Sequence, residues 1–120
     1  MAVEVAGPAA LLVAKAHKLH DRVASGKATR IDDKDAADVV RLMQTTAPAV
    51  VGETLTMLSR DDVAGLVALD GMNYVEKLFG RRGARGTEMA VRALRVGMPE
   101  ASVETLCTSY TERLLDVARV

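Results

Sequence analysis

Aromatic residues are nearly absent from this sequence, which contains no Trp, one Phe and two Tyr. A core without large rings must be built from many small contacts, and apolar residues, mostly Ala, Val and Leu, make up 49% of the chain. Small side chains allow helices to approach each other closely, so this composition favours helix–helix packing. The length of 120 residues is that of one domain, and we expect a single domain over residues 1–120.

Net charge, disulfides and long apolar runs are also missing. Sixteen basic residues balance sixteen acidic ones, which excludes a global field for binding nucleic acid or membranes, so any such binding must be local. The single cysteine, Cys107, cannot form an internal disulfide, and we expect it to be a small buried side chain on the last helix. No signal-peptide pattern or membrane-length apolar run is present. The sequence therefore predicts a soluble, cytoplasmic protein that does not enter a membrane.

The apolar residues that remain recur with helical spacing between helix caps, prolines and glycines. This pattern predicts an all-α fold, a helical bundle of five or six helices joined by short turns. The second helix is predicted to open with an acidic capping box from Asp32 to Asp35, the fourth to bend near Asp70-Gly71, and the fifth to be capped by Thr87. The predicted helices span residues 8–25, 32–44, 47–58, 61–79, 88–96 and 100–119.

The first residues have a different pattern. Ala2-Val3-Glu4-Val5-Ala6 alternates small apolar and polar residues and ends at Gly7-Pro8, which predicts one short strand over residues 2–6 before the bundle. A single strand cannot satisfy its own backbone hydrogen bonds. We therefore expect it to pair with its twin in a homodimer, or with a sheet in a separate N-terminal half.

Two charged residues fall among apolar positions. On a helical wheel, Lys15 lies between Leu11 and Leu19, and Asp35 lies within the apolar arc of the next helix. A lone buried charge is costly, so each residue needs a partner. In a structural interpretation, the two form a bridge that joins the helices. In a functional interpretation, they line a cleft, where the lysine is aimed at phosphate and the aspartate orients it.

The residues around this pair resemble a known family. The run Leu11-Leu12-Val13-Ala14-Lys15 and the later run Lys34-Asp35-Ala36-Ala37-Asp38-Val39 are similar to the later half of AbiEii-type nucleotidyltransferases, the bacterial abortive-infection and toxin–antitoxin family. In that family, a lysine on the helix after a sheet strand and an aspartate in a basic-Asp-x-x-Asp helix start belong to the active site. The resemblance implies that Lys15 contacts a nucleoside triphosphate and that Asp35 completes the site. It implies weaker roles for Lys18, Lys34 and Asp38.

The chain departs from that family in one respect. Family members carry an upstream Gly-Ser turn and an Asp-x-Asp strand, whose carboxylates hold the divalent metal. The adjacent pairs Asp32-Asp33 and Asp61-Asp62 instead fit helix caps, so we predict no metal site. We expect the chain to be a split or truncated relative, inactive alone, that uses Mg²⁺ and a nucleoside triphosphate only when a metal-bearing half is supplied. The alternative is a non-enzymatic helical interaction or dimerisation domain.

Two further groups could bind ligands. The segment from Gly80 to Gly86 gathers Arg81, Arg82 and Arg85 among glycines, which suits contact with a nucleotide or tRNA phosphate. A solvated basic loop is the alternative interpretation. His17 and His20 are three residues apart, which is not the spacing of two neighbouring metal ligands on a helix. We expect both to lie on the polar side of the first helix.

Overall fold

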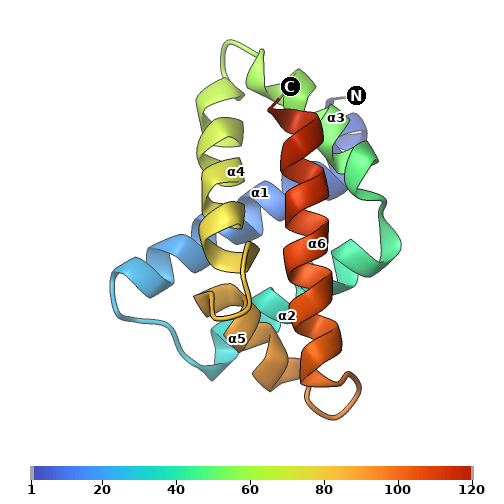
Figure 1. The fold of residues 1–120 in the computed structure, drawn as a ribbon. Coiled ribbons are helices and arrows are strands. Elements are labelled where there is room, and N and C mark those ends of the chain that lie inside the picture. The colour runs from blue at the N-terminus through green and yellow to red at the C-terminus, as the bar shows by residue number, and fades with distance from the viewer. Residues whose placement is uncertain (1, 120) are drawn as a thin grey trace.

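The computed structural model describes the backbone of residues 2–119 and the side chains of residues 7–119. All regular structure in this part of the chain is helical, which confirms the predicted all-α bundle (Figure 1). No helix within it combines the length and the apolar character that a membrane crossing requires. The six helices are α1 (Ala2–Ala24), α2 (Arg30–Thr45), α3 (Pro48–Ser59), α4 (Gly65–Phe79), α5 (Arg85–Leu94) and α6 (Glu100–Ala118).

The predicted strand over residues 2–6 is wrong, because these residues form the beginning of α1. The helix is interrupted at Gly7, whose backbone angles are φ 0° and ψ −99°, and Pro8 follows. A helix satisfies its backbone hydrogen bonds locally, whereas a strand needs a neighbouring strand, and none is present among the described residues. Pro8 lacks an N–H and its ring crowds the preceding turn, which explains why the break falls at this position.

Helix α2 begins earlier than predicted. Thr29 is its N-cap, and the Thr29 hydroxyl accepts a hydrogen bond from the Ile31 amide at 3.3 Å. The Asp32 carboxylate accepts a hydrogen bond from the Thr29 amide at 2.8 Å, which completes a capping box. The predicted box from Asp32 to Asp35 is therefore wrong. The Asp35 side chain takes no part in capping α2 and instead faces α1, where it contacts Lys15.

Helices α1 and α4 approach closely at a glycine. A Cβ atom added to Gly71 would lie 2.9 Å from Cγ1 of Val13, so only glycine fits this contact. Helix α4 runs without a break from Gly65 to Phe79, through the site of the predicted bend at Asp70-Gly71. Gly71 therefore serves helix packing and does not break the helix.

The connection between α4 and α5 is shorter than predicted. Helix α5 begins at Arg85, so Gly86 lies inside it and only residues 80–84 connect the two helices. Thr87 does not cap the helix as predicted. It is fully buried, and its hydroxyl donates a hydrogen bond to the carbonyl oxygen of Arg81 at 3.1 Å. The arginine-rich segment is therefore an ordered turn followed by a helix start.

The helices pack so that α1 contacts α2 and α4, while α2 lies against α5 and α3 against α6. Helix α6 runs along the length of the bundle, and α5 and the first turns of α2 form the lower end in Figure 1. Cys107 of α6 is completely buried, as predicted, and burial raises the pKa of its thiol to about 11. The thiol is therefore protonated at neutral pH.

Candidate functional site

The two charged residues expected among apolar positions meet between α1 and α2. The Lys15 Nζ atom lies 2.5 Å from Oδ1 of Asp35 and 3.2 Å from Oδ2 of Asp38. The Lys18 Nζ atom lies 2.8 Å from the other carboxylate oxygen of Asp35. On the far side, Arg41 pairs with Asp38 at 3.0 Å. The predicted need of Lys15 and Asp35 for partners is thus met by a network of five charged side chains.

Burial differs across this network. Only 10% of the Asp35 side chain is exposed and 23% of the Lys15 side chain, whereas Lys18 is 55% exposed. Burial acts to raise the pKa of Asp35, but the hydrogen bonds from Lys15 and Lys18 outweigh it and hold that pKa below 3.8. The hydrogen bond to Asp35 is also the main cause of the raised pKa of Lys15. Lys15 and Asp35 are therefore both charged at neutral pH.

A groove of about 500 Å³ borders the network. We call it the Lys15 groove, and its lining includes Lys15, Asp38, Arg41, Leu11, Leu42 and Thr46. Asp35 does not line it, although its carboxylate bonds the amine of Lys15. The two residues therefore have different geometric roles, since Lys15 borders the groove and Asp35 holds Lys15 from the protein side.

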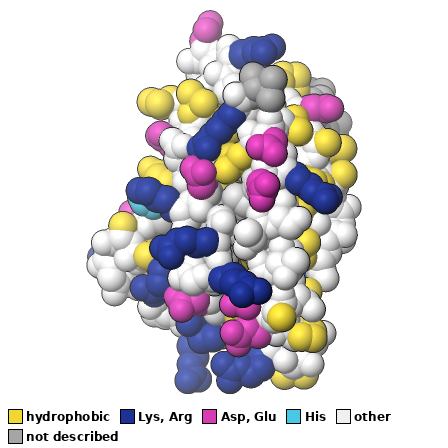
Figure 2. Space-filling view, viewed as in Figure 1, with side chains coloured by type: hydrophobic (Ala, Val, Ile, Leu, Met, Phe, Trp, Pro, Cys, Tyr) yellow, Lys and Arg dark blue, Asp and Glu magenta, His cyan; other side chains and the backbone are white. Residues whose placement is uncertain are grey.

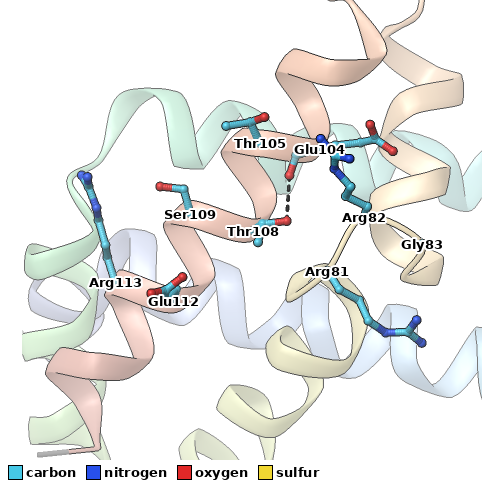
Figure 3. Close-up of a pocket in the computed structure, with 9 residues that line it drawn as sticks. All are labelled: Arg81, Arg82, Gly83, Glu104, Thr105, Thr108, Ser109, Glu112 and Arg113. Carbon is cyan, nitrogen blue, oxygen red and sulfur yellow. Dashed lines mark hydrogen bonds between the residues drawn. The ribbon is translucent and has the colours of Figure 1, made fainter.

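The predicted arginine cluster is divided by the structure. Arg81 and Arg82 border a second groove, of about 770 Å³, against α6, whereas Arg85 begins α5 and does not line it. In Figure 3, Arg82 extends toward Glu104, while Arg81 and Arg113 point in opposite directions. The three guanidinium groups at this groove do not converge on one point. None of its lining residues belongs to the Lys15 groove.

Lys34 and the two histidines lie apart from the Lys15 groove. Lys34 is exposed and is not among the lining residues of that groove. The expectation that the histidines occupy the polar side of α1 is wrong, because both pack against Tyr74 of α4. The His20 ring stacks on Tyr74 with centroids 3.8 Å apart, and the His17 ring meets it edge-on at 5.0 Å. The histidines therefore supply part of the α1–α4 contact.

A second ion pair, which the sequence did not predict, lies at the other end of α2. Arg92 of α5 donates two hydrogen bonds to Asp33, from Nε to Oδ2 at 3.2 Å and from Nη2 to Oδ1 at 3.0 Å. The pair joins residues 59 positions apart, so no local motif contains both. No local pattern marks Arg92 as the partner of Asp33, so the pair could not be found from the sequence alone.

The described residues do not form a site suited to Mg²⁺. Among them, no group of three or more His, Cys, Asp or Glu side chains is arranged to hold a metal ion. Asp35 and Asp38 are already bound by Lys15, Lys18 and Arg41, so their oxygens face cations. No chemical step can therefore be assigned to a metal held by these side chains.

Comparison with known proteins gives no relative for this chain: no family model, no curated protein and no solved structure matches it. The candidate site therefore depends on the geometry of its own residues.

Acid should destabilise the protein through Asp32 and Asp35. The hydrogen bond from the Thr29 amide lowers the pKa of Asp32, and the two lysines lower that of Asp35. A carboxyl group whose pKa is lower in the folded state than in the unfolded state stabilises the protein at pH values above its unfolded-state pKa. This stabilisation is lost as the pH falls through the folded-state pKa. We expect the free energy of unfolding, measured in urea, to decrease as the pH falls below about 3.8. An Asp35→Asn variant should lose less free energy of unfolding over the same pH range. A loss equal to that of the unmodified protein would contradict the stabilising role of the Asp35 carboxylate.

Proposed function

We propose that this chain is the helical portion of an AbiEii-type nucleotidyltransferase-like protein, in which Lys15 contacts the phosphates of a nucleoside triphosphate. One observation carries the proposal: the Lys15 amine lies at the wall of the Lys15 groove and is held there by Asp35 and Asp38 of the neighbouring helix. The phosphate chain would lie along this groove, and Arg41 lines the same wall.

Preorganisation of the lysine supports this role. A free lysine side chain samples many rotamers, and ordering it on binding costs about 2 kcal/mol at most. The bonds to Asp35 and Asp38 already restrict Lys15, so less of that cost remains when a ligand binds. Asp35 acts as a positioning residue in this scheme. Lys18 lies close to the second carboxylate oxygen of Asp35 and adds another cation beside the site.

The charge of the network also suits an anion. Three cations, Lys15, Lys18 and Arg41, face the two carboxylates of Asp35 and Asp38, so the sum is 3 − 2 = +1. Lys18 and Arg41 are more than half exposed and can turn toward a ligand. A triphosphate entering the groove would meet this excess of positive charge.

Phosphoryl transfer needs a divalent metal as well, and the described residues do not hold one. In this proposal, a separate metal-bearing half supplies the carboxylates for Mg²⁺, and the helical portion binds and orients the triphosphate. The chain alone would then bind nucleotide without catalysing transfer.

A second candidate is a helical interaction or dimerisation domain, in which Lys15 and Asp35 are only a bridge. The observation in its favour is a run of exposed apolar side chains at the start of α4 and just before it. They are exposed by 46–89%, and they are Val63, Leu66, Val67 and Leu69. A second copy of the chain could cover this face.

Replacing Lys15 with methionine tests the first candidate. Methionine keeps the apolar stem but removes the amine, and the loss of a charged hydrogen bond should weaken triphosphate binding about tenfold. Binding of ATP, CTP, GTP and UTP in the presence of Mg²⁺ can be measured by calorimetry with the purified chain. Lys77→Met is the matched control, since Lys77 lies on α4 and does not line the groove.

The two candidates give different results in this experiment. Binding that is weakened by Lys15→Met and unchanged by Lys77→Met supports the nucleotide role. If no triphosphate binds, or if Lys15→Met changes only the free energy of unfolding, Lys15 and Asp35 are a structural bridge and the nucleotide proposal is rejected.

A further inference from the structure

A separate pocket lies between the first turn of α2 and the end of α5. We call it the Arg92 pocket; its volume is about 350 Å³, and it is lined by Arg30, Asp33, Arg92, Arg95 and Val96. Three guanidinium groups therefore meet one carboxylate. None of these residues lines the Lys15 groove, which lies toward the other end of α2. Asp33 and Arg41 are eight residues apart on that helix, which corresponds to about 12 Å along its axis.

One side of the pocket is held by an ion pair, and the other side carries arginines without such a partner. Arg92 is held by its two hydrogen bonds to Asp33, whose side chain is only 9% exposed. This geometry orients the planar guanidinium, because a bidentate pair restricts its rotation. Arg30 and Arg95 have no carboxylate within 4 Å among the described residues, so their N–H donors are available to a ligand.

The charge of the Arg92 pocket exceeds that of either groove. Its lining sums to 3 − 1 = +2. The lining of the Lys15 groove, with Lys15 and Arg41 against Asp38, sums to 2 − 1 = +1. The groove beside α6 also sums to +1, with three arginines against two glutamates. The lining of the Arg92 pocket is therefore the most positive of the three, and outside the lining the charge of Glu88 of α5 also acts on Arg92.

Other basic side chains without an ion-pair partner lie on the same two helices and in the turns beside them. Five more basic side chains on α5, on α2 and in the adjoining turns have no carboxylate within 4 Å in the described part of the chain: Lys27, Lys34, Arg81, Arg82 and Arg85. Figure 2 shows Lys and Arg side chains at the lower end of the molecule, with Asp and Glu side chains between them, and Figure 1 assigns this end to α5 and the start of α2.

We propose that the Arg92 pocket binds a phosphate group. Guanidinium forks match the oxygens of a phosphate, and a phosphate dianion would neutralise the +2 charge of the lining. Asp33 fixes Arg92 from within, while Arg30 and Arg95 close on the anion from the two helices. The phosphate comes either from a small free anion or from a nucleic acid, since both present the same oxygens.

Titration with two phosphate probes tests the proposal. Inorganic phosphate and a 5′-phosphorylated trinucleotide are added at constant ionic strength, and the arginine Nε–Hε signals are followed by NMR. We expect saturable shifts at Arg30 and Arg95. Arg95→Gln should weaken binding about tenfold, because it removes a charged hydrogen-bond donor. Arg60→Gln, a change at an exposed arginine after α3, should leave the affinity unchanged.

The outcomes separate the sources and can reject the proposal. Tighter binding of the trinucleotide assigns the phosphate to a nucleic acid, and equal affinity assigns it to a small anion. Absence of saturable shifts with both probes would overturn the proposal, as would equal weakening by Arg95→Gln and Arg60→Gln. Lys15→Met should leave this binding intact, so failure of the nucleotide proposal and failure of this one are distinguishable.

Discussion

Replacing Phe79 with alanine is expected to lower the free energy of unfolding by about 3–5 kcal/mol. Phe79 is the only phenylalanine in the chain, and its side chain is completely buried at the end of α4. Among the buried core residues the only other aromatic side chain is Tyr110, whose hydroxyl is held by the carbonyl oxygen of Thr46, so a cavity should remain. Small domains are stable by about 5–15 kcal/mol in total, so this loss is a large part of the whole. Chemical denaturation followed by circular dichroism measures it.

Leu66→Ala is the matched control on the same helix. Leu66 is 71% exposed, so removing its side chain should change the free energy of unfolding by only about 0.5 kcal/mol. Similar losses of free energy of unfolding for Phe79→Ala and Leu66→Ala would show that the Phe79 side chain is not buried in the core.

Replacing Gly86 with alanine is expected to cost about 1–3 kcal/mol, even though alanine favours helix more than glycine does. The added Cβ atom would lie 2.6 Å from the carbonyl oxygen of Leu78 and 2.8 Å from the ring of Phe79. Because one of these atoms belongs to the backbone, α5 must move away from α4. That movement should also displace Arg92 and Arg95 and weaken phosphate binding in the Arg92 pocket.

Gly83→Ala provides the control for this substitution. Gly83 lies three residues earlier, in the connection before α5, and a Cβ atom added there meets nothing within 4 Å. We expect its free energy of unfolding to match that of the unmodified protein. A Gly86→Ala protein as stable as Gly83→Ala would contradict the close packing of α5 on α4.

The candidate site was predicted in part because helical periodicity is a local property. The wheel placed Lys15 and Asp35 within apolar arcs, and the cost of burying a charge required partners for both. The structure confirms that the two residues bond to each other. Their assignment to a nucleotide site stays a prediction. That Asp38 binds the same lysine could not be derived, because it depends on the rotation of α2 against α1.

The Arg92 pocket shows the limit of sequence analysis. Asp33 was expected to cap a helix, and no sequence motif included Arg92 or Arg95. They meet because α2 packs against α5, and that contact depends on how every helix fills the core. The three arginines of the predicted cluster do not line one groove, because neighbours in the chain need not point together, as Arg81 and Arg82 show in Figure 3.

The sequence by itself determined an all-helical chain, because apolar periodicity, prolines and helix-capping residues act within a few positions of the backbone. Some helix ends were predicted at the wrong residues, and residues 2–6 were predicted to form a strand. Five small residues that alternate between apolar and polar are too few to distinguish the period of a strand from that of a helix. Only the tertiary structure decided which charges meet. Coulomb interactions act between side chains that are close in space, and helix packing sets those distances. It brings Asp33 to Arg92, whereas Arg30 and Arg95 in the same pocket have no carboxylate within 4 Å in the described part of the chain.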